Sequence, residues 1–240
     1  MSTITRRLRE NQNVRFGKHQ AKPNLSAEHK KKRLEFATQN VSFTRSEWDK
    51  IIFSDEKKWN LDGPDGLPGF WFDLRKEKSI FSKRHSGGGG VMVWGGFSTA
   101  GSTDLIFCKP KMTSIDYQDI LADHLLPVAP LITSGDYIFM QDNAPIHRST
   151  STKSWLEANE VKTLDWPPLS PDLNPIENLW GYLSRKVYGN GRQFTSIPAL
   201  KAEIVKCWSE VTPELRTNLI LSMKDRLIKV IQNRGGSIDY

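Results

Sequence analysis

The chain has 240 residues, enough for one large domain, because a chain of this length buries roughly 70–75% of its unfolded surface and needs no disulfide or metal to fold. Its two cysteines, Cys108 and Cys207, lie far apart and form no C-x-x-C pair, which argues against a zinc ribbon and a disulfide framework and fits a reducing compartment. The N-terminal residues lack the apolar stretch of a signal peptide, and no apolar run approaches the ~20 residues that a membrane span requires. We therefore expect a soluble, intracellular protein with no membrane partner.

The formal net charge is +7, and the positive charge is concentrated near the first residues. Residues 1–34 hold ten Lys and Arg against two Glu and so carry +8, whereas the rest of the chain sums to −1. A basic arm on a near-neutral body favours a polyanionic partner, because each cation placed on a phosphate releases a condensed counterion. An ordinary solvated leader would carry the same charge, so both interpretations stay open. The cations that would bind a polyanion are Arg6, Arg7, Arg9, Arg15, Lys18, Lys22, Lys30, Lys31, Lys32 and Arg33.

Three segments of different character precede the main body of the chain. Residues 2–10 are predicted to form a short helix, and the polar residues 11–25 form a linker. Residues 26–40 are predicted to form a second helix with Leu34 and Phe36 among its few apolar anchors. The run Lys30 to Arg33 is therefore expected to face mostly water, as a nuclear-import signal, a phosphate-binding face or an ordinary exposed surface.

The rest of the chain alternates between apolar strands and helices. The first two strands are separated by a Gly/Pro-rich excursion at residues 62–69 and by the glycine run 87–90. The glycine run lacks the Lys-Ser/Thr of a P-loop, which favours a flexible hairpin over a phosphate-binding loop. We expect strands at 51–53, 91–94, 105–107, 137–140 and around 161–164, and helices at 115–132, 150–159, 175–188, 196–210 and 213–233. This order predicts an α/β fold, a mixed five-stranded sheet with helices on both faces.

Asp55 and Asp142 share a sequence context, because each directly follows a short apolar strand. If those strands are neighbours, both carboxylates emerge at one edge of the sheet and can share a cation. Glu177 lies in the first turn of the helix that follows the Pro-rich loop 166–175. Three carboxylates from separate elements suit a hard divalent cation, which prefers oxygen ligands and keeps positions open for phosphate. Two such ions about 3.5–4 Å apart can activate a water or a 3′-hydroxyl and stabilise the leaving oxygen in phosphoryl transfer.

Each of these acids also has a purely structural interpretation. Asp55 could end its strand in an Asx-turn, and Asp142 could form a turn before Pro145. Glu177 has the strongest such alternative, since Asn174 as N-cap and Glu177 three residues later make a capping box. Taken singly, none of the acids indicates a function, so the case depends on their combination and surroundings.

Four blocks of sequence surround the three acids, namely Ser54-Asp-Glu-Lys-Lys58, Val91-Met-Val-Trp-Gly95, Gln141-Asp-Asn-Ala-Pro-Ile-His147 and Ser170-Pro-Asp-Leu-Asn-Pro-Ile-Glu-Asn-Leu-Trp180. Together they resemble the catalytic core of DDE transposases of the Tc/mariner superfamily. The third acid is Glu and follows Asp142 by 35 residues, which is closer to the Tc side, because the mariner side usually ends its triad in Asp. The resemblance covers about residues 22–240, and the last block is highly specific.

The resemblance implies a ribonuclease-H-like fold in which Asp55, Asp142 and Glu177 are the catalytic and metal-binding triad. The implied cofactor is a pair of Mg²⁺ ions, which Mn²⁺ can replace. The implied reaction is cut-and-paste DNA transposition: hydrolysis at the terminal inverted repeats, then attack of the freed 3′-hydroxyl on target DNA, typically at TA. The implied partners are transposon inverted repeats and target DNA, bound by a homodimer in the nucleus.

Other residues near the acids have weaker assignments. Asn143 and His147 are candidate active-site neighbours, with His147 as a contact to the scissile phosphate or the attacking group, although a histidine in a loop or at a helix start is commoner. Arg148, Lys153 and the loop of residues 60–90 are expected to touch DNA or a second subunit, and the resemblance suggests that loop as a clamp between subunits. We expect packing rather than base stacking of Trp59, Trp166 and Trp180.

The N-terminal end departs from the family pattern. Family members carry a paired helix-turn-helix region that binds the inverted repeats, whereas residues 1–25 hold only a remnant, its last helix plus a basic linker, before a catalytic domain at 26–240. One helix cannot hold a helix-turn-helix together, so recognition of the ends is expected to be impaired while the chemistry stays available. The competing functions are therefore an active transposase catalytic domain and a catalytically silent relic that binds DNA or dimerises. A nuclease acting on RNA–DNA hybrids is a third, which the block 170–180 argues against.

Overall fold

The computed structural model describes residues 23–63 and 89–239, and the structural statements below concern those residues. The predicted helix 2–10, nearly all of the linker 11–25 and most of the loop 60–90 lie outside them. None of the helices within the described ranges is long and apolar enough to cross a membrane.

A four-stranded mixed sheet, in the order β3-β2-β1-β4, lies at the centre of the fold. Strand β1 (Ile51–Asn60) runs antiparallel to β2 (Gly90–Phe97) and parallel to β4 (Ile138–Met140), and β2 runs antiparallel to β3 (Ile106–Cys108). The α/β class and the mixed sheet are thereby confirmed. The expected fifth strand near 161–164 is reduced to a single bridge between Thr163 and Phe139, because the chain turns away at once into prolines that cannot donate to a ladder.

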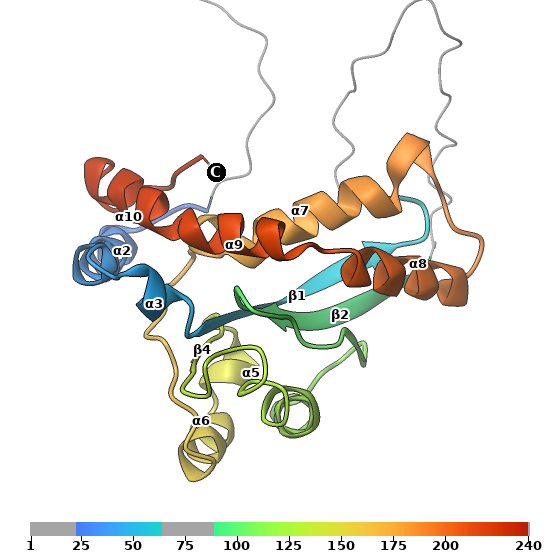
Figure 1. Cartoon of the computed structure of the whole chain (residues 1–240), viewed down its shortest axis with the longest axis horizontal. Helices are drawn as coiled ribbons and strands as arrows, with labels where there is room; N and C mark the ends of the chain where they lie inside the picture. The colour runs from blue at the N-terminus through green and yellow to red at the C-terminus, as the bar shows by residue number, and fades with distance from the viewer. Residues whose placement is uncertain (1–22, 64–88, 240) are drawn as a thin grey trace, which may run out of the picture.

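Helices cover both faces of this sheet, as Figure 1 shows. One face carries the C-terminal helices together with the two that precede β1, and the other carries the helices between β3 and the Pro-rich loop. The first group is α2 (Ala27–Asn40), α3 (Arg45–Trp48), α7 (Pro175–Val187), α8 (Ile197–Ser209), α9 (Pro213–Leu221) and α10 (Met223–Gln232). The second group is α4 (Ser114–Ile120), α5 (Pro145–Arg148) and α6 (Thr150–Ala158). Short 3₁₀ turns lie at Pro171–Leu173 and Gly189–Gly191.

The two faces of the sheet bury separate apolar clusters, as the alternation of side chains along a strand requires. In β1, Ile51 and Phe53 belong to the cluster under α7, whereas Ile52 belongs to the cluster under α4. This alternation continues past Phe53, so the next residues of β1 also point alternately to the two faces.

Strand β1 is longer than its sequence predicts. Its second half is polar, yet it continues to Asn60 because each residue from Phe53 onward is paired with β2, in a register that places Asp55 opposite Gly95. Asp55 therefore lies inside a strand and not at its end, and its interpretation as a strand-ending Asx-turn is wrong.

Two predicted helices are interrupted. The predicted helix 115–132 is α4 followed by a π-helical turn (Leu121–Leu125) and irregular turns, because Pro127 and Pro130 cannot occupy a helix interior. The predicted helix 213–233 is divided into α9 and α10 at Ser222, whose hydroxyl donates to the Leu219 carbonyl and so competes with the helical backbone.

Arg33 corrects the expectation that the basic run of α2 faces water. Its side chain is fully buried, and its guanidinium donates to both carboxylate oxygens of Asp172, at 2.8 and 2.7 Å, and to the carbonyl oxygens of Gly235 and Gly236. Helical spacing explains this position, because Arg33 falls on the same face of α2 as the buried Phe36. Its assignment to DNA binding is therefore wrong, and it is a structural residue.

Candidate active site

The three predicted acids line one cleft of about 580 Å³. Asp55 comes from β1, Asp142 from the loop after β4, and Glu177 from the first turn of α7. The remaining wall is made mainly by the loop 166–171, which carries the prolines. The structure thus brings together residues that lie up to 122 positions apart in the chain.

Two hydrogen bonds next to the acids tie their three elements together. Ser54 Oγ donates to the Met140 carbonyl at 2.8 Å, which joins β1 to β4 two residues before Asp142. Asn174 Nδ2 donates to the Ser54 carbonyl at 3.2 Å, which joins the N-cap of α7 to β1. Because Ser54 and Asn174 are buried, these bonds fix the backbone positions of the three acids relative to one another.

Asp55 is held by a buried indole. The Nε1 of Trp180 donates to Asp55 Oδ2 at 3.2 Å. Gly95, the cross-strand partner of Asp55, leaves room for the side chain of Leu105, since a Cβ at position 95 would lie 2.7 Å from Leu105 Cδ2.

Asp142 combines a turn with a histidine contact. Its Oδ1 accepts from the Ala144 N–H at 2.8 Å, so the predicted turn role is present, and the same oxygen lies 2.7 Å from His147 Nδ1. The other carboxylate oxygen, Oδ2, has no hydrogen-bond partner within the described part of the chain. Asp142 is therefore oriented through one oxygen, which leaves the second available to a ligand.

Glu177 does not act as a cap. The N-cap Asn174 accepts from the Ile176 N–H at 3.3 Å, but α7 has no capping box. No hydrogen bond to the Glu177 carboxylate comes from any residue that the structure describes. The capping-box interpretation of Glu177 is therefore not supported, and its carboxylate is available to a ligand in the cleft.

Negative charge accumulates in this cleft and shifts the acids' pKa values. Burial raises the pKa of Asp55 well above its usual range, and repulsion from Glu177, Glu56 and Asp142 raises it further. The Glu177 residue is exposed overall, yet burial of its carboxyl group by the surrounding protein raises its pKa. The charge of Lys57 opposes this rise, and the charge of Asp142 adds to it. For Asp142, desolvation is outweighed by the hydrogen bonds from His147 and Ala144, which lower its pKa.

The donor set fits a hard divalent cation. Carboxylate oxygens are the ligands that Mg²⁺ and Mn²⁺ prefer, and the mutual repulsion of Asp55 and Glu177 is what such a cation would relieve. No three His, Cys, Asp or Glu side chains of the described residues are already gathered closely enough to hold an ion. Ligation by all three acids therefore requires side-chain rotation within the cleft.

His147 is a neighbour of Asp142, as predicted, but it is buried, with 3% of its surface exposed. Its Nε2 lies 3.3 Å from Glu56 Oε1, and the ring of Tyr117 stacks on it with a centroid distance of 4.2 Å. The two carboxylates outweigh desolvation and raise the pKa of His147 to about 9. In this structure His147 orients Asp142 through the contact of its Nδ1 with Asp142 Oδ1, and its predicted contact with a scissile phosphate stays a prediction.

Two residues of this site were missed by the sequence analysis. Glu56 contacts His147 from the face of β1 opposite to that of Asp55, and the indole of Trp180 bonds Asp55. The alternation of a strand that continued beyond Phe53 would have indicated the first of them. Asn143, the other candidate neighbour, lines the cleft and donates from Nδ2 to the Trp166 carbonyl at 2.8 Å. The expectation of packing is confirmed by the burial of Trp59, Trp166 and Trp180.

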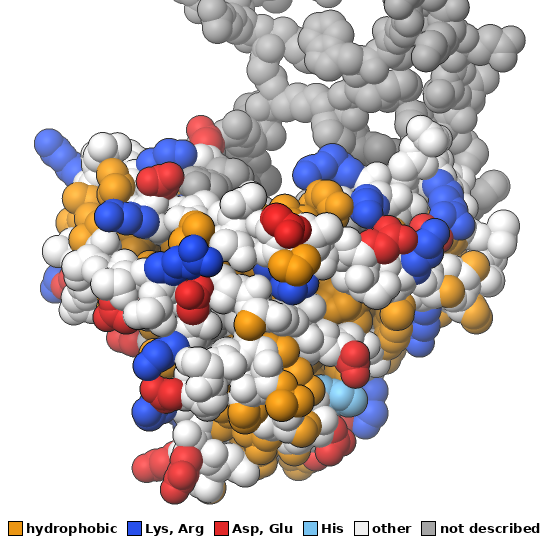
Figure 2. Space-filling view, viewed as in Figure 1, with side chains coloured by type: hydrophobic (Ala, Val, Ile, Leu, Met, Phe, Trp, Pro, Cys, Tyr) orange, Lys and Arg blue, Asp and Glu red, His pale blue; other side chains and the backbone are white. Residues whose placement is uncertain are grey.

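The predicted phosphate-binding cations are only partly described. Lys30, Lys31 and Lys32 are exposed on α2, as predicted. On the face seen in Figure 2, Lys and Arg side chains are interspersed with Asp and Glu and form no broad positive patch. The cations that lie outside the described residues are Arg6, Arg7, Arg9, Arg15, Lys18 and Lys22.

Comparison with known proteins agrees with this site. A family model described as DDE superfamily endonuclease matches residues 50–201. The chain is 46% identical over 218 residues to the Tc3 transposase of Caenorhabditis elegans, covering 91% of this chain and 65% of that protein. It is 33% identical over 244 residues to the Tc1 transposase of the same organism, covering 99% and 87%. The chain belongs to the Tc/mariner group of DDE transposases. It spans about two thirds of the length of the Tc3 relative.

Solved structures show the fold of this family. The Mos1 transposase in its paired-end complex with the left transposon end superposes with a TM-score of 0.80 at 20% identity, covering 98% of this chain and 71% of that one. The catalytic domain of Mos1 mariner transposase gives 0.68 at 18% identity, covering 92% and 100%. The expected ribonuclease-H-like fold of this DDE family member is therefore confirmed, with four strands in its described sheet.

Proposed function

We propose that this chain is the catalytic domain of a DNA transposase, which hydrolyses phosphodiester bonds at transposon ends and transfers the freed 3′ end into target DNA at TA sites. The observation that carries the proposal is the shared cleft of Asp55, Asp142 and Glu177, formed by three elements of a DDE-family fold. In this proposal residues 26–240 form the catalytic domain, and residues 1–25 are a basic segment that contacts DNA.

Two Mg²⁺ ions, or Mn²⁺ in their place, are the proposed cofactor. Solved Mos1 complexes contain Mg or Mn, which supports a divalent ion here. Bound divalent ions would lower the pKa of the attacking hydroxyl and stabilise the leaving oxygen. The residues that would hold them are Asp55, Asp142 and Glu177.

The chain's own contribution is to orient these ligands. Trp180 restrains Asp55 through Oδ2, and His147 with the Ala144 N–H restrains Asp142 through Oδ1. Two of the three proposed ligands are thus oriented by a buried or backbone donor before the cleft is filled, whereas Glu177 has no such restraint among the described residues.

The proposed partners are transposon-end DNA and target DNA, bound by a homodimer in the nucleus. The paired-end description of the solved Mos1 complexes supports an assembly that holds DNA ends together. The exposed Lys30 to Lys32 support nuclear import, which a fluorescent fusion with and without three Gln substitutions at these lysines would test.

The enzymatic proposal is tested by incubating the purified chain with supercoiled plasmid and Mg²⁺ or Mn²⁺. Nicked circles are expected for the parent chain and for Asp136→Asn, an exposed carboxylate paired with Lys50 and Lys162, and none for Asp142→Asn. Mn²⁺ binding measured by calorimetry should be weakened in Asp142→Asn alone. A folded parent chain that nicks with neither metal would instead support the catalytically silent relic.

A further inference from the structure

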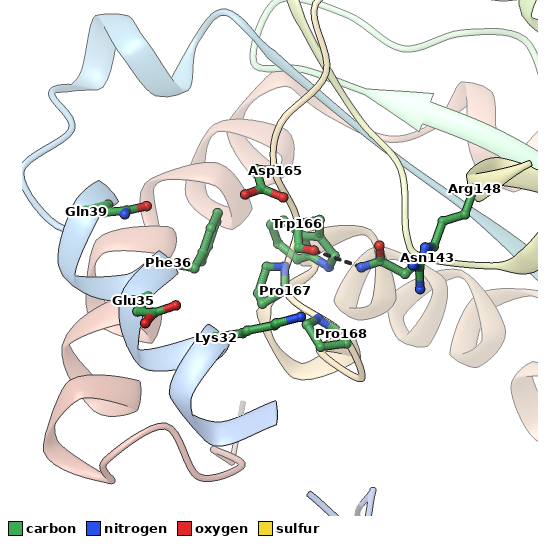
Figure 3. A pocket seen from close by; sticks show the side chains of 10 residues that line it. All are labelled: Lys32, Glu35, Phe36, Gln39, Asn143, Arg148, Asp165, Trp166, Pro167 and Pro168. Atoms are coloured by element: carbon green, nitrogen blue, oxygen red, sulfur yellow. Dashed lines mark hydrogen bonds between the residues drawn. The ribbon is translucent and has the colours of Figure 1, made fainter. Parts of the chain in front are cut away.

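A second pocket adjoins the acid cleft. It has a volume of about 360 Å³ and lies between α2 and the Pro-rich loop (Figure 3). The two hollows have five lining residues in common, which are Asn143, Arg148, Trp166, Pro167 and Pro168. A continuous groove therefore leads from the three acids across Pro167 and Pro168 to α2, and we call it the proline groove.

We propose that the proline groove binds the sugar–phosphate backbone of the DNA strand that carries the scissile phosphate, with Arg148 and Lys32 as its phosphate ligands. This proposal rests on the proposed function for the presence of DNA in the cleft. It adds a path for the strand beyond the acids and assigns two cations to it.

Two cations lie on opposite sides of the prolines. In Figure 3 the Lys32 side chain extends from α2 along Pro167 toward Pro168, and Arg148 of α5 directs its guanidinium toward Asn143. Arg148 is exposed, and its guanidinium has no hydrogen bond or ion pair with any described residue. Among the described residues, Lys32 is paired only with the exposed Glu28, at 3.7 Å, a contact that contributes little. Both cations are thus available to an external anion.

The anions of the same pocket do not cancel this charge. Glu35 lines the pocket, and its Oε1 lies 3.9 Å from the Nζ of Lys31, an exposed cation that does not line it. Asp165 lies in Figure 3 at the end of the pocket away from Pro168. The stretch between Arg148 and Lys32 therefore presents positive charge beside the strongly acidic cleft, where a phosphate chain would otherwise be repelled.

The floor of the groove is rigid and offers no base contacts. Trp166 is 6% exposed, its ring meets Phe36 at a centroid distance of 5.1 Å, and its carbonyl accepts from Asn143. Pro167 and Pro168 have fixed φ angles and no N–H groups. Since no aromatic face is free for stacking, this floor suits a backbone, and the contacts position the strand without recognising its sequence.

The spacing of phosphates explains why the groove lies where it does. Successive phosphates of one strand rise about 3.4 Å along a DNA axis. When one phosphate lies at the acids, its neighbours in the strand must therefore lie close to the cleft. The proline groove begins at residues that line the cleft itself.

The test uses the full chain and a fluorescent duplex, with dissociation constants measured by anisotropy at several salt concentrations. Arg148→Gln and Lys32→Gln should each reduce the log–log salt slope by about 0.9, and the double variant by about 1.8. The matched control is Lys162→Gln, which removes an exposed cation outside the groove and should leave the slope unchanged. All the altered side chains are exposed, so the melting temperatures should not change.

The outcomes separate this inference from the proposed function. Reduced slopes for both groove variants, equal for two unrelated duplex sequences, support the groove whether or not the parent chain nicks plasmid. Slopes that match the Lys162 control overturn the groove, even if the parent chain nicks plasmid normally. A reduction that appears with one sequence only would also overturn it, because a backbone contact cannot depend on the bases.

Discussion

The indole of Trp180 donates a hydrogen bond to the carboxylate of Asp55 across 3.2 Å. Trp180 is fully buried on α7 and stacks on Trp208 with a centroid distance of 5.5 Å. One side chain thus belongs to the apolar core and also fixes a proposed metal ligand, so the packing between α7 and α8 is coupled to the orientation of Asp55.

Trp180→Phe should keep much of the packing and remove the hydrogen bond to Asp55. We expect a loss of roughly 10- to 100-fold in Mn²⁺ affinity or nicking rate, as for other residues that orient metal ligands, with about 1–3 kcal/mol of destabilisation. Trp208→Phe is the control, because that indole donates to the Thr103 carbonyl at 2.8 Å and not to an acid. Calorimetry and urea unfolding measure the two effects. Equal losses of Mn²⁺ affinity in both variants would show that core packing alone matters.

Glu177→Gln should abolish nicking without harming the fold. Since Glu177 forms no capping box and its negative charge raises the pKa of Asp55, the neutral side chain should change the free energy of unfolding by well under ~1 kcal/mol. A neutral amide is a poor ligand for a hard cation, so the activity should collapse. Plasmid nicking and urea unfolding are measured on the same preparation, and a destabilised variant with proportionate loss of activity would contradict the ligand role.

Arg33→Ala should destabilise the protein by about 3–5 kcal/mol, because it leaves the half-buried Asp172 without its bidentate partner. Lys31→Ala, which removes an exposed side chain of the same helix paired only weakly with Glu35, should stay within about 0.5 kcal/mol of the parent. Urea unfolding compares the two. If Arg33 bound DNA instead, its removal would flatten the salt dependence of binding and leave stability unchanged.

The basic segment before α2 should supply affinity for DNA but little sequence preference. A deletion must end at residue 22, because removal of residues 1–34 would also remove Arg33 and half of α2. Residues 1–22 hold six Lys and Arg against Glu10, and their loss should lower the salt slope while metal binding persists. Anisotropy with inverted-repeat and scrambled duplexes measures both quantities. A preference above about a hundredfold for the repeat would show that this segment contacts bases.

Cys108 should react slowly with alkylating agents near neutral pH. Burial raises the pKa of its thiol from 9.0 to about 11, with Glu56 adding to the rise. A raised folded pKa contributes stability that is present below about pH 9 and is lost as the pH rises toward 11. In a Cys207→Ala background, the iodoacetamide rate should reach its half-maximum near pH 11 for the native protein and near pH 9 in urea. Identical pH profiles for the native and the urea-unfolded protein would show that the fold does not raise the pKa of the Cys108 thiol.

Much of the architecture was predictable because its signals are local. The starts of β1, β2 and β4 and the Asn174-Pro175 start of α7 were predicted to within one residue. The family blocks identified Asp55, Asp142 and Glu177, and the structure places all three in one cleft.

The features that were missed depend on long-range pairing. The polar half of β1 is a strand only because β2 lies beside it, so Glu56 could not be assigned to the face of His147. Arg33 was misassigned because a charge normally indicates solvent, and its partner Asp172 lies 139 positions away. The short helix α3 was overlooked, although Thr44 and Glu47 form a capping box that marks its start.

The position of Arg33 has a consequence for the order in which the protein can mature during synthesis. Its guanidinium reaches the Gly235 and Gly236 carbonyls, and Asp172 accepts from the Ile238 N–H at 2.8 Å. Gly235 itself crosses so close to α2 that a Cβ there would collide with the Lys30 carbonyl. The loop that leads into Glu177 can therefore form its hydrogen bonds with residues 235–238 only after these residues have left the ribosome. A nascent chain still attached within this stretch carries all three acids, yet its cleft is unfinished, so competence to cut DNA should arise only after residues 235–238 have been released to fold.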